Sequence, residues 1–104
     1  MRGDLYRLRS GKDTTGHEPR GPRYAVSIQT YGILLSTLIV APTSASAQPA
    51  IFRPEIEVDG VRARVLVDQM RAVDASRLGD FAGRLDAVES GEVDRAIRLM
   101  LGVL

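Results

Sequence analysis

Apolar and polar residues alternate in several short segments of the chain, which is the pattern of β-strands with one buried face. The alternation is clear in Asp4–Leu8 and returns in Ile51–Val58 and Arg62–Asp68. Between the last two stands Asp59-Gly60, a dipeptide that strongly favours a two-residue hairpin turn. Because Pro54 has no N–H to donate to a neighbouring strand, we expect the strand 51–58 to lie at a sheet edge.

Two longer apolar runs, Arg23–Thr30 and Gly32–Ala41, are rich in β-branched and aromatic residues and predict central strands. We expect Pro42 to end the second run. The segment Asp74–Leu78 predicts a single helical turn with Asp74 as its cap. A last short strand is expected over Phe81–Leu85.

The C-terminal segment has helical periodicity from about Ala87 to Leu101, and Asp86 is the expected N-cap. Its apolar residues recur every three or four positions and form one stripe, made of Val93, Ala96, Ile97, Met100, Leu101 and Leu104. We expect this stripe to pack on a sheet, of its own chain or of a partner. Short strands followed by one helix predict an α+β, mainly β fold, a small curved antiparallel sheet or barrel in a single domain over residues 1–104.

The apolar run Ile33–Ala41, followed by Ala45-Ser46-Ala47, has some features of a secretory signal. The run is much shorter than the about 20 apolar residues that a membrane helix needs. The segment before it is long and contains Asp4, Asp13 and Glu18, which is too acidic for the start of a signal peptide. We therefore interpret the run as a buried strand and expect no membrane association.

The composition, with 44% hydrophobic and 26% charged residues, is that of a folded chain. A chain of 104 residues buries only about two thirds of its unfolded surface, so dimerisation is a usual source of extra stability. The absence of cysteine excludes disulfides and thiolate chemistry and suits the cytoplasm. All of the 14 basic residues except Lys12 are arginine, whose planar guanidinium suits bidentate phosphate recognition.

Candidate chemistry concentrates in the loop Gly16–Tyr24, which is rich in glycine, proline and ionisable residues and leads into a strand. A polar loop held by a strand is a common place for a site, although an ordinary surface loop has the same composition. The chain contains no P-loop, no dinucleotide-binding glycine motif, no serine-hydrolase elbow and no zinc-protease motif. Because His17 is the only histidine, a metal site is not expected either.

What remains is a set of arginines, one histidine, an early glutamate and a hydroxyl-rich loop. This inventory suits chemistry on a phosphodiester that uses charge in place of a metal. An arginine and a hydroxyl could neutralise the phosphoryl oxygens while a histidine or carboxylate moves protons. RNA supplies its own nucleophile in the 2′-OH, which DNA lacks, so RNA is the expected substrate.

Five blocks of residues follow one another along nearly the whole chain. They are Arg2-Gly3-Asp4-Leu5-Tyr6; Gly16-His17-Glu18-x-x-Gly21-x-Arg23; Val40-Ala41-Pro42-Thr43-Ser44; Asp68-Gln69-x-Arg71-x-Val73-Asp74 with Arg77-Leu78; and Gly83-Arg84-Leu85 with Glu92-Val93-Asp94-Arg95-Ala96. Each block is short, but five in the same order are specific. Together they resemble the MazF/PemK (Kid) family of toxin endoribonucleases.

The resemblance implies an SH3-like, PemK/CcdB-type antiparallel barrel with a C-terminal helix, acting as a homodimer. It also implies sequence-specific cleavage of single-stranded mRNA through a 2′,3′-cyclic phosphate, without a metal or other cofactor. The implied partner is a small MazE-like antitoxin, whose flexible acidic tail occupies the RNA groove.

The resemblance assigns roles position by position. Arg23 matches the arginine that stabilises the pentacoordinate phosphate, and Thr43 matches the hydroxyl residue that holds the scissile phosphate. Glu18 matches the catalytic loop glutamate, while His17 and Asp68 match positions of proton carriers in the PemK/Kid branch. The RNA-binding residues that it implies are Arg20, Ser44, Gln69 and Arg71.

Structural alternatives stand beside these roles. An ion pair with Glu18 or Asp4 would explain Arg23, and a cap at the strand end would explain Thr43. For His17 and Asp68 the alternative is an ordinary place on the surface or in a turn.

The chain departs from the family pattern at three places. Tyr24 stands where family members usually have proline, and Leu66 stands where the Kid branch has arginine. Gln29–Gly32 replaces a longer loop that helps to shape the RNA groove, so the sequence does not predict which RNA sequence is cut.

Two other functions use the same fold. One is a non-enzymatic relative, either a CcdB-like poison of DNA gyrase or an inactive toxin remnant; the other is an RNA-binding barrel without catalysis. The presence of both Arg23 and Thr43 favours the ribonuclease, because a gyrase poison needs neither.

Overall fold

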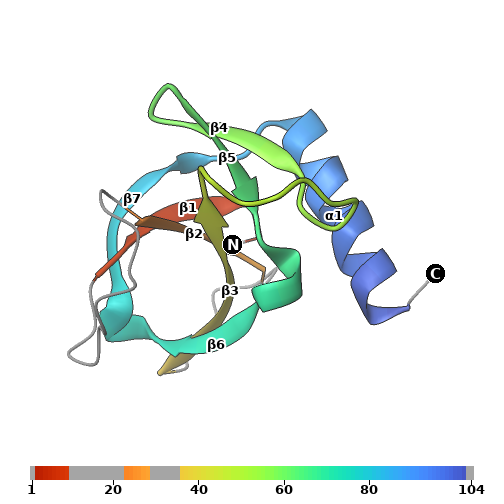
Figure 1. The fold of residues 1–104 in the computed structure, drawn as a ribbon. Helices are drawn as coiled ribbons and strands as arrows, with labels where there is room; N and C mark the ends of the chain where they lie inside the picture. Colours follow the sequence, from red (N-terminus) through yellow and green to blue (C-terminus); the bar gives the residue numbers. More distant parts are fainter. Residues whose placement is uncertain (1, 10–22, 29–35, 103–104) are drawn as a thin grey trace.

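The computed structural model describes residues 2–9, 23–28 and 36–102. Across these ranges it contains seven strands and one α-helix: β1 (Asp4–Leu8), β2 (Arg23–Ser27), β3 (Thr37–Ser44), β4 (Glu55–Val58), β5 (Val61–Val65), β6 (Arg71–Asp74), β7 (Leu78–Arg84) and α1 (Ala87–Leu101). Two short 3₁₀ turns, η1 (Val67–Gln69) and η2 (Ala75–Arg77), flank β6. Figure 1 shows the strands curling around a ring, with the β4–β5 hairpin at one side and α1 beside it. This confirms the predicted antiparallel barrel with a C-terminal helix.

Every strand pairing among the described residues is antiparallel, and β3 lies at the centre of the sheet. The strand order is β4-β5-β3-β2-β1-β7, and β6 pairs with the first half of β3. The prediction that Pro42 ends this strand was wrong, because β3 continues to Ser44. On one edge, β3 leaves β6 at Val40 and joins β5 at Thr43. Pro42 lies between these two ladders, where its missing N–H costs no ladder bond on that edge, and its carbonyl accepts from the Leu66 N–H at 2.8 Å.

Several other element bounds differ from the predicted ones. The strand expected from residue 51 begins only at Glu55, directly after Pro54, and it is the edge strand of the sheet. Its partner ends at Val65, since the chain turns into η1. The strand β6 was not predicted, and β7 begins at Leu78, three residues before the predicted start at Phe81. The Asp59-Gly60 turn is confirmed, with positive φ angles of 51° and 78° between the paired residues Val58 and Val61.

The main hydrophobic core lies between the sheet and the middle of α1. Val93, Ala96 and Ile97 of the predicted stripe are buried against strand residues. Met100 and Leu101 were expected to be buried with them, but their side chains are 39% and 59% exposed. The stripe therefore packs on the sheet of its own chain only through the middle turns of the helix, and its last predicted member, Leu104, lies outside the described residues.

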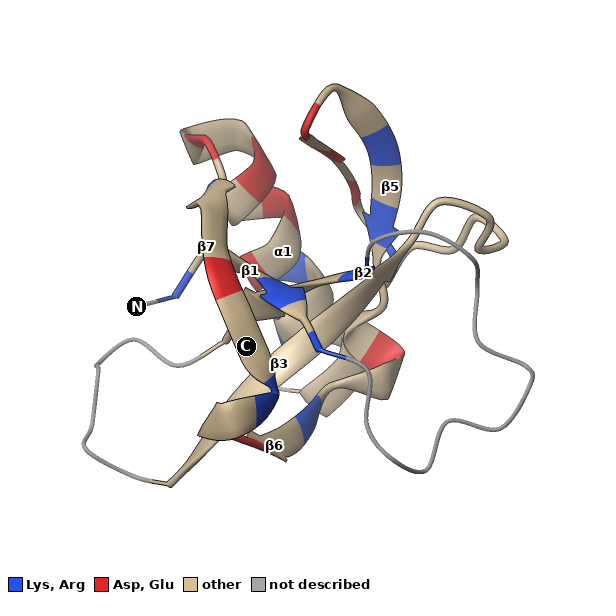
Figure 2. Ribbon diagram, turned by 90° about the vertical axis from the view of Figure 1, so that its left-hand side faces the viewer, with Lys and Arg blue, Asp and Glu red and all other residues tan. Residues whose placement is uncertain are grey.

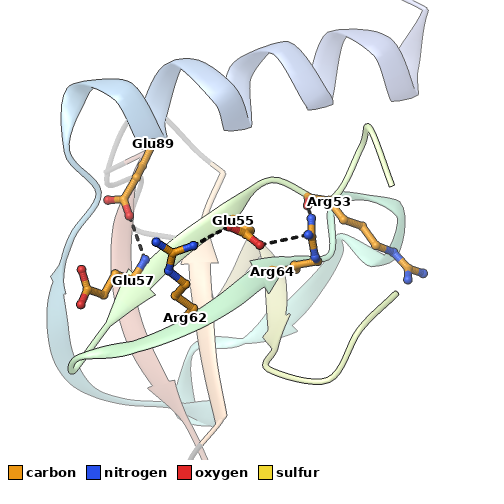
Figure 3. A network of polar contacts seen from close by, with 6 residues as sticks. All are labelled: Arg53, Glu55, Glu57, Arg62, Arg64 and Glu89. Carbon is orange, nitrogen blue, oxygen red and sulfur yellow. Dashed lines mark hydrogen bonds and ion pairs between the residues drawn. The ribbon is translucent and has the colours of Figure 1, made fainter. Parts of the chain in front are cut away.

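A capping box begins α1 at Asp86, as predicted. The Asp86 carboxylate accepts from the Glu89 N–H at 2.7 Å, and the Glu89 carboxylate accepts from the Asp86 N–H at 3.0 Å. The second carboxylate oxygen of Glu89 accepts from the Glu57 N–H at 2.9 Å, which ties β4 to the first turn of the helix (Figure 3). In the described part of the chain, no helix has the length and apolar character needed to cross a membrane.

The predicted cap at Asp74 is also confirmed. Its carboxylate accepts from the Ser76 N–H at 2.9 Å and so begins η2. The hydrogen bonds from Ser76 lower the pKa of Asp74, because they stabilise its ionised form.

Candidate active site

A pocket of about 710 Å³ opens where the β4–β5 hairpin faces the ends of β1, β2 and β3. Its polar and ionisable lining comes mainly from the three sheet strands, and the hairpin supplies much of its apolar wall. Among the described residues the lining consists of Arg7, Arg23, Tyr24, Thr43, Ser44, Ala45, Ser46, Val58, Asp59, Val61 and Ala63. The pocket is large enough to hold a small ligand or part of a polymer.

The topology of the sheet brings Arg23 and Thr43 to this pocket from distant parts of the sequence. Arg23 begins β2, and Thr43 stands near the end of the antiparallel neighbour β3. The register pairs Ala25 with Pro42, so the following pair of positions is Tyr24 and Thr43. There the Thr43 hydroxyl donates to the Tyr24 carbonyl at 3.2 Å, and the Thr43 residue is only 6% exposed. The two residues expected to act on a phosphate therefore line one pocket.

Ser44 also lines the pocket and is half-buried. Its hydroxyl oxygen accepts from the Ser46 N–H at 3.3 Å, a turn-like bond that holds the chain after β3. Hydroxyl groups from two successive residues, Thr43 and Ser44, thus lie at the end of β3 with a guanidinium from β2 in the same pocket.

A second group of polar side chains lines the pocket, and the sequence analysis did not identify it as a site. The Tyr24 hydroxyl donates a hydrogen bond to the carboxylate of Asp59 at the hairpin tip. The Arg7 guanidinium lies 5.6 Å from the centre of the Tyr24 ring and 3.9 Å from an Asp59 oxygen. The hydrogen bond to Asp59, followed by burial, raises the pKa of Tyr24 above its ordinary value of 10.0. One member of this group, Tyr24, had been noted in the sequence as a departure from the proline that is usual in the family.

Polar contacts at its base hold the hairpin that bears Asp59 (Figure 3). Glu55 accepts from Arg62 at 3.3 Å and from Arg64 at 3.0 Å. Arg64 also donates to the Arg53 carbonyl at 2.8 Å, which links β5 to the segment before β4. Exposed ion pairs of this kind are individually weak, but here they accompany the Glu89 contact with the backbone of β4. The hairpin wall is therefore held at its base and at its tip.

Figure 2 shows the basic positions of β1 and of the start of β2 side by side, which agrees with the pairing of Leu8 with Arg23. Several acidic positions gather on α1 in the same view. The pocket thus lies beside a basic edge of the sheet, with Arg7 and Arg23 both in its lining. Such an edge attracts anions such as a nucleic-acid backbone.

Known proteins resemble this chain in sequence and in fold. Residues 1–101 match the model of the PemK-like, MazF-like toxin family of type II toxin-antitoxin systems. The Mycobacterium tuberculosis protein Rv3098A is 44% identical over 104 residues, which cover 99% of this chain and 98% of that protein. The chain belongs to the PemK-like, MazF-like toxin family.

Two further relatives agree with this assignment. Endoribonuclease EndoA of Bacillus subtilis is 32% identical over 111 residues, covering 99% of this chain and 95% of EndoA. A chain in the MazE–MazF crystal structure from Deinococcus radiodurans superposes with a TM-score of 0.77 at 22% identity. That match covers 99% of this chain and 95% of the solved chain, and it shows that the fold is that of MazF.

Of the residues that the MazF/PemK resemblance assigned, three meet in the pocket: Arg23, Thr43 and Ser44. Asp4, one of the two carboxylates considered as an ion-pair partner for Arg23, accepts from Arg84 at 2.9 Å. His17, Glu18 and Arg20 lie outside the described residues.

Asp68 does not line the pocket. Its two carboxylate oxygens accept from the Arg53 guanidinium at 3.1 and 2.9 Å, a bidentate pair. The hydrogen bonds from Arg53 lower the pKa of Asp68, so this carboxyl group is ionised at neutral pH. Gln69 and Arg71 follow in η1 and β6 with exposed side chains and are likewise not part of the pocket lining.

Within the described ranges, no three His, Cys, Asp or Glu side chains are grouped so that they could hold a metal ion.

Proposed function

We propose that this MazF/PemK-family protein is an endoribonuclease toxin that cleaves single-stranded mRNA at specific sequences, without a metal ion, and so inhibits translation and growth. The observation that carries the proposal is the meeting of Arg23 and Thr43 in one pocket. Membership of the toxin family and the 32% identity to endoribonuclease EndoA support it. As the sequence predicts, residues 1–104 would act as one toxin domain, and an mRNA substrate would place it in the cytoplasm.

In the proposed reaction, the RNA is both substrate and nucleophile. The 2′-OH loses its proton and attacks the adjacent phosphorus, while the bond from phosphorus to the 5′-oxygen breaks and that oxygen takes up a proton. The products are a 2′,3′-cyclic phosphate and a 5′-hydroxyl end. Arg23 would donate hydrogen bonds to the non-bridging oxygens as their negative charge grows, and the Thr43 hydroxyl would hold the same phosphate.

Proton transfer in this mechanism is assigned to the loop that precedes β2. His17 and Glu18 are the proposed proton carriers, as the resemblance implies, and Arg20 would bind the RNA beside them. No step of the proposed reaction is assigned to Asp68, because its carboxylate is hydrogen-bonded to Arg53 and does not line the pocket.

The direct test is incubation of the purified protein with a long single-stranded RNA in EDTA, followed by mapping of the new 5′ ends. Discrete cuts ending in 2′,3′-cyclic phosphate are expected, and their positions would give the recognition sequence. Intact RNA, with the protein shown to be folded, would contradict the proposal and favour a binding-only role such as that of a CcdB-like gyrase poison.

A pair of arginine variants distinguishes a catalytic role of Arg23 from a general effect of positive charge on RNA cleavage. Arg23→Ala is expected to lower the cleavage rate by about a thousandfold, since removal of one preorganised donor costs on this order. Arg98→Ala removes the same charge from the exposed face of α1 and is expected to cleave normally. Equal rates for the two variants, both with wild-type circular dichroism, would remove Arg23 from the mechanism.

We also propose a homodimer that a MazE-like antitoxin neutralises. The solved MazE–MazF structure from Deinococcus radiodurans holds a chain of the same fold together with MazE. Met100 and Leu101 at the end of α1 are exposed in the single chain and offer an apolar surface for a second copy. An acidic antitoxin tail would fit the basic edge formed by Arg7 and Arg23, where it would exclude RNA.

A further inference from the structure

Arg7, Tyr24 and Asp59 form a connected group that the proposed reaction has not used. Arg7 comes from β1, Tyr24 from β2 and Asp59 from the turn between β4 and β5, and all three line the pocket. The group connects β1 and β2 to the tip of the β4–β5 hairpin. Its contacts therefore join the two walls of the pocket.

The strand register explains why Arg7 faces Tyr24. The two residues are directly opposite each other in the β1–β2 pair, so their side chains lie on the same face of the sheet. Arg23, which precedes Tyr24 at the start of β2, lines the same pocket. Arg7 and Arg23 therefore reach one pocket from two neighbouring strands, and an RNA chain that enters it presents more than one phosphate to them.

The contacts of Asp59 leave much of the Arg7 guanidinium available. The Tyr24 hydroxyl is the hydrogen-bond donor to the Asp59 carboxylate. The Arg7–Asp59 ion pair is long, at 3.9 Å, and both side chains are 52% exposed, so the pair is weak and well solvated. The Tyr24 ring and the Asp59 carboxylate thus orient the guanidinium without saturating its five N–H donors.

We propose that Arg7 binds a second phosphate of the RNA, next to the phosphate held by Arg23 and Thr43, and that Tyr24 and Asp59 are its positioning residues. The assignment rests on the proposed function, because it names a further contact with the same substrate. A single-stranded RNA carries one phosphate per nucleotide, so a chain with one phosphate at Arg23 presents the next one nearby. Arginine suits this role because its planar fork can donate two hydrogen bonds to one phosphate.

The test measures RNA affinity separately from cleavage. The probe is a fluorescent single-stranded RNA of about 20 nucleotides, longer than a typical single-strand site. It carries the mapped cut with the attacking 2′-OH methylated, or a mixed sequence if no cut is found. Fluorescence anisotropy is recorded over a range of NaCl concentrations for the wild type, Arg7→Ala, Arg7→Lys and the charge-matched control Arg98→Ala.

The logarithm of the RNA association constant falls linearly with the logarithm of the NaCl concentration. Loss of one phosphate contact in Arg7→Ala is expected to make this slope less steep by about 0.7, the value per phosphate for single strands. Arg7→Lys keeps the charge and is expected to keep the slope. With cleavable RNA, Arg7→Ala is expected to raise KM about tenfold, as for loss of a hydrogen bond between charged groups, while kcat stays near that of the wild type. An Arg7→Ala protein with the slope and KM of Arg98→Ala would overturn the assignment.

Variants of the positioning residues complete the test. Tyr24→Phe and Asp59→Ala break the link to the hairpin tip, and both are expected to raise KM with an unchanged kcat. Asp59→Asn retains an oxygen that can accept from the Tyr24 hydroxyl and is expected to raise KM less than Asp59→Ala does. If Asp59→Asn is as impaired as Asp59→Ala, the hydrogen bond to Tyr24 has no positioning role.

The outcomes separate this inference from the proposed function. Cleavage by the wild type together with identical behaviour of Arg7→Ala and Arg98→Ala would overturn only the role of Arg7. A wild type that binds RNA without cutting it would overturn the proposed reaction, and the salt slopes would still decide the role of Arg7. A wild type that neither binds nor cuts RNA would overturn both.

Discussion

The hydroxyl of Thr43 donates a hydrogen bond to the backbone carbonyl of Tyr24, with 3.2 Å between the two oxygens. The bond joins β3 to β2 one residue after Arg23, inside the lining of the pocket. A hydroxyl has one proton to donate, so Thr43 has to rotate away from this carbonyl before it can donate to a phosphoryl oxygen. Thr43 thus supports the strand pair, and in the proposed reaction the same hydroxyl would contact the phosphate.

Thr43→Ala is the first prediction, and it separates these two roles of the hydroxyl. We expect cleavage to fall by about a hundredfold, as for the loss of one donor to a developing oxyanion. The free energy of unfolding should fall by only about 1 kcal/mol, the usual worth of one hydrogen bond. Thr43→Ser retains the hydroxyl and should retain most of the activity. Equal cleavage rates for the alanine variant and the wild type would confine the hydroxyl to a structural role.

The ion pair of Asp68 with Arg53 predicts how stability depends on pH. Arg53 lowers the pKa of Asp68 below its ordinary value of 3.8, so the folded state favours the ionised carboxylate. The resulting stability is fully present above pH 3.8 and is lost as the pH falls through the lowered folded-state pKa. Urea unfolding should therefore show a stability difference between the wild type and Asp68→Asn at pH 7 that shrinks toward pH 2.

RNA cleavage by the same Asp68→Asn protein at neutral pH tests whether this carboxylate is a proton carrier, the role that the resemblance implied. We expect cleavage to continue, because Asp68 is not part of the pocket lining. Lost cleavage with unchanged stability would instead identify Asp68 as a proton carrier and contradict a purely structural role in the pair with Arg53.

Glu89 connects the start of α1 to β4, and its removal is expected to weaken both. Its two carboxylate oxygens accept from the N–H groups of Asp86 and Glu57. Glu89→Ala should lower the free energy of unfolding by about 1–2 kcal/mol, the range for loss of a helix cap. Glu89→Gln keeps an acceptor oxygen for the capping box and should lose less. Identical urea midpoints for the wild type and the alanine variant would show that neither contact stabilises the fold.

The local elements of this fold could be predicted from the sequence because local chemistry determines them. The Asp59-Gly60 turn, the caps at Asp74 and Asp86 and the strand Asp4–Leu8 each depend on neighbouring residues, and all were confirmed. The strand β6 was missed because it has four residues with one buried side chain, and it exists through pairing with the distant β3. The course of β3 through Pro42 was missed for the same reason, since it depends on which neighbour pairs at each position.

The candidate site likewise has a part that could be predicted from the sequence and a part that could not. Composition indicated phosphate chemistry, and only the resemblance to MazF/PemK selected Arg23 and Thr43, which the structure places in one pocket. The contact between Tyr24 and Asp59 joins residues 35 positions apart, and neither residue has a local pattern that predicts it. Contacts of this kind depend on how the hairpin sits over the sheet, which alternation and turn signals do not specify.

The exposed end of α1 provides the last prediction, which concerns the proposed homodimer. Met100 and Leu101 continue the apolar stripe but are exposed in the single chain. A double change to glutamine, Met100→Gln with Leu101→Gln, should leave the fold of the chain intact, because glutamine is a good helix former and neither residue is in the core.

In a two-fold dimer each change counts twice, and each side chain buried there would contribute on the order of 1.5–3 kcal/mol. The double variant should therefore raise the dimer Kd more than about a hundredfold in sedimentation measurements over a dilution series. Val88→Gln, at the opposite end of α1 and 75% exposed, is the control and should dimerise normally. A double variant that dimerises as tightly as this control would show that the end of α1 is not the interface.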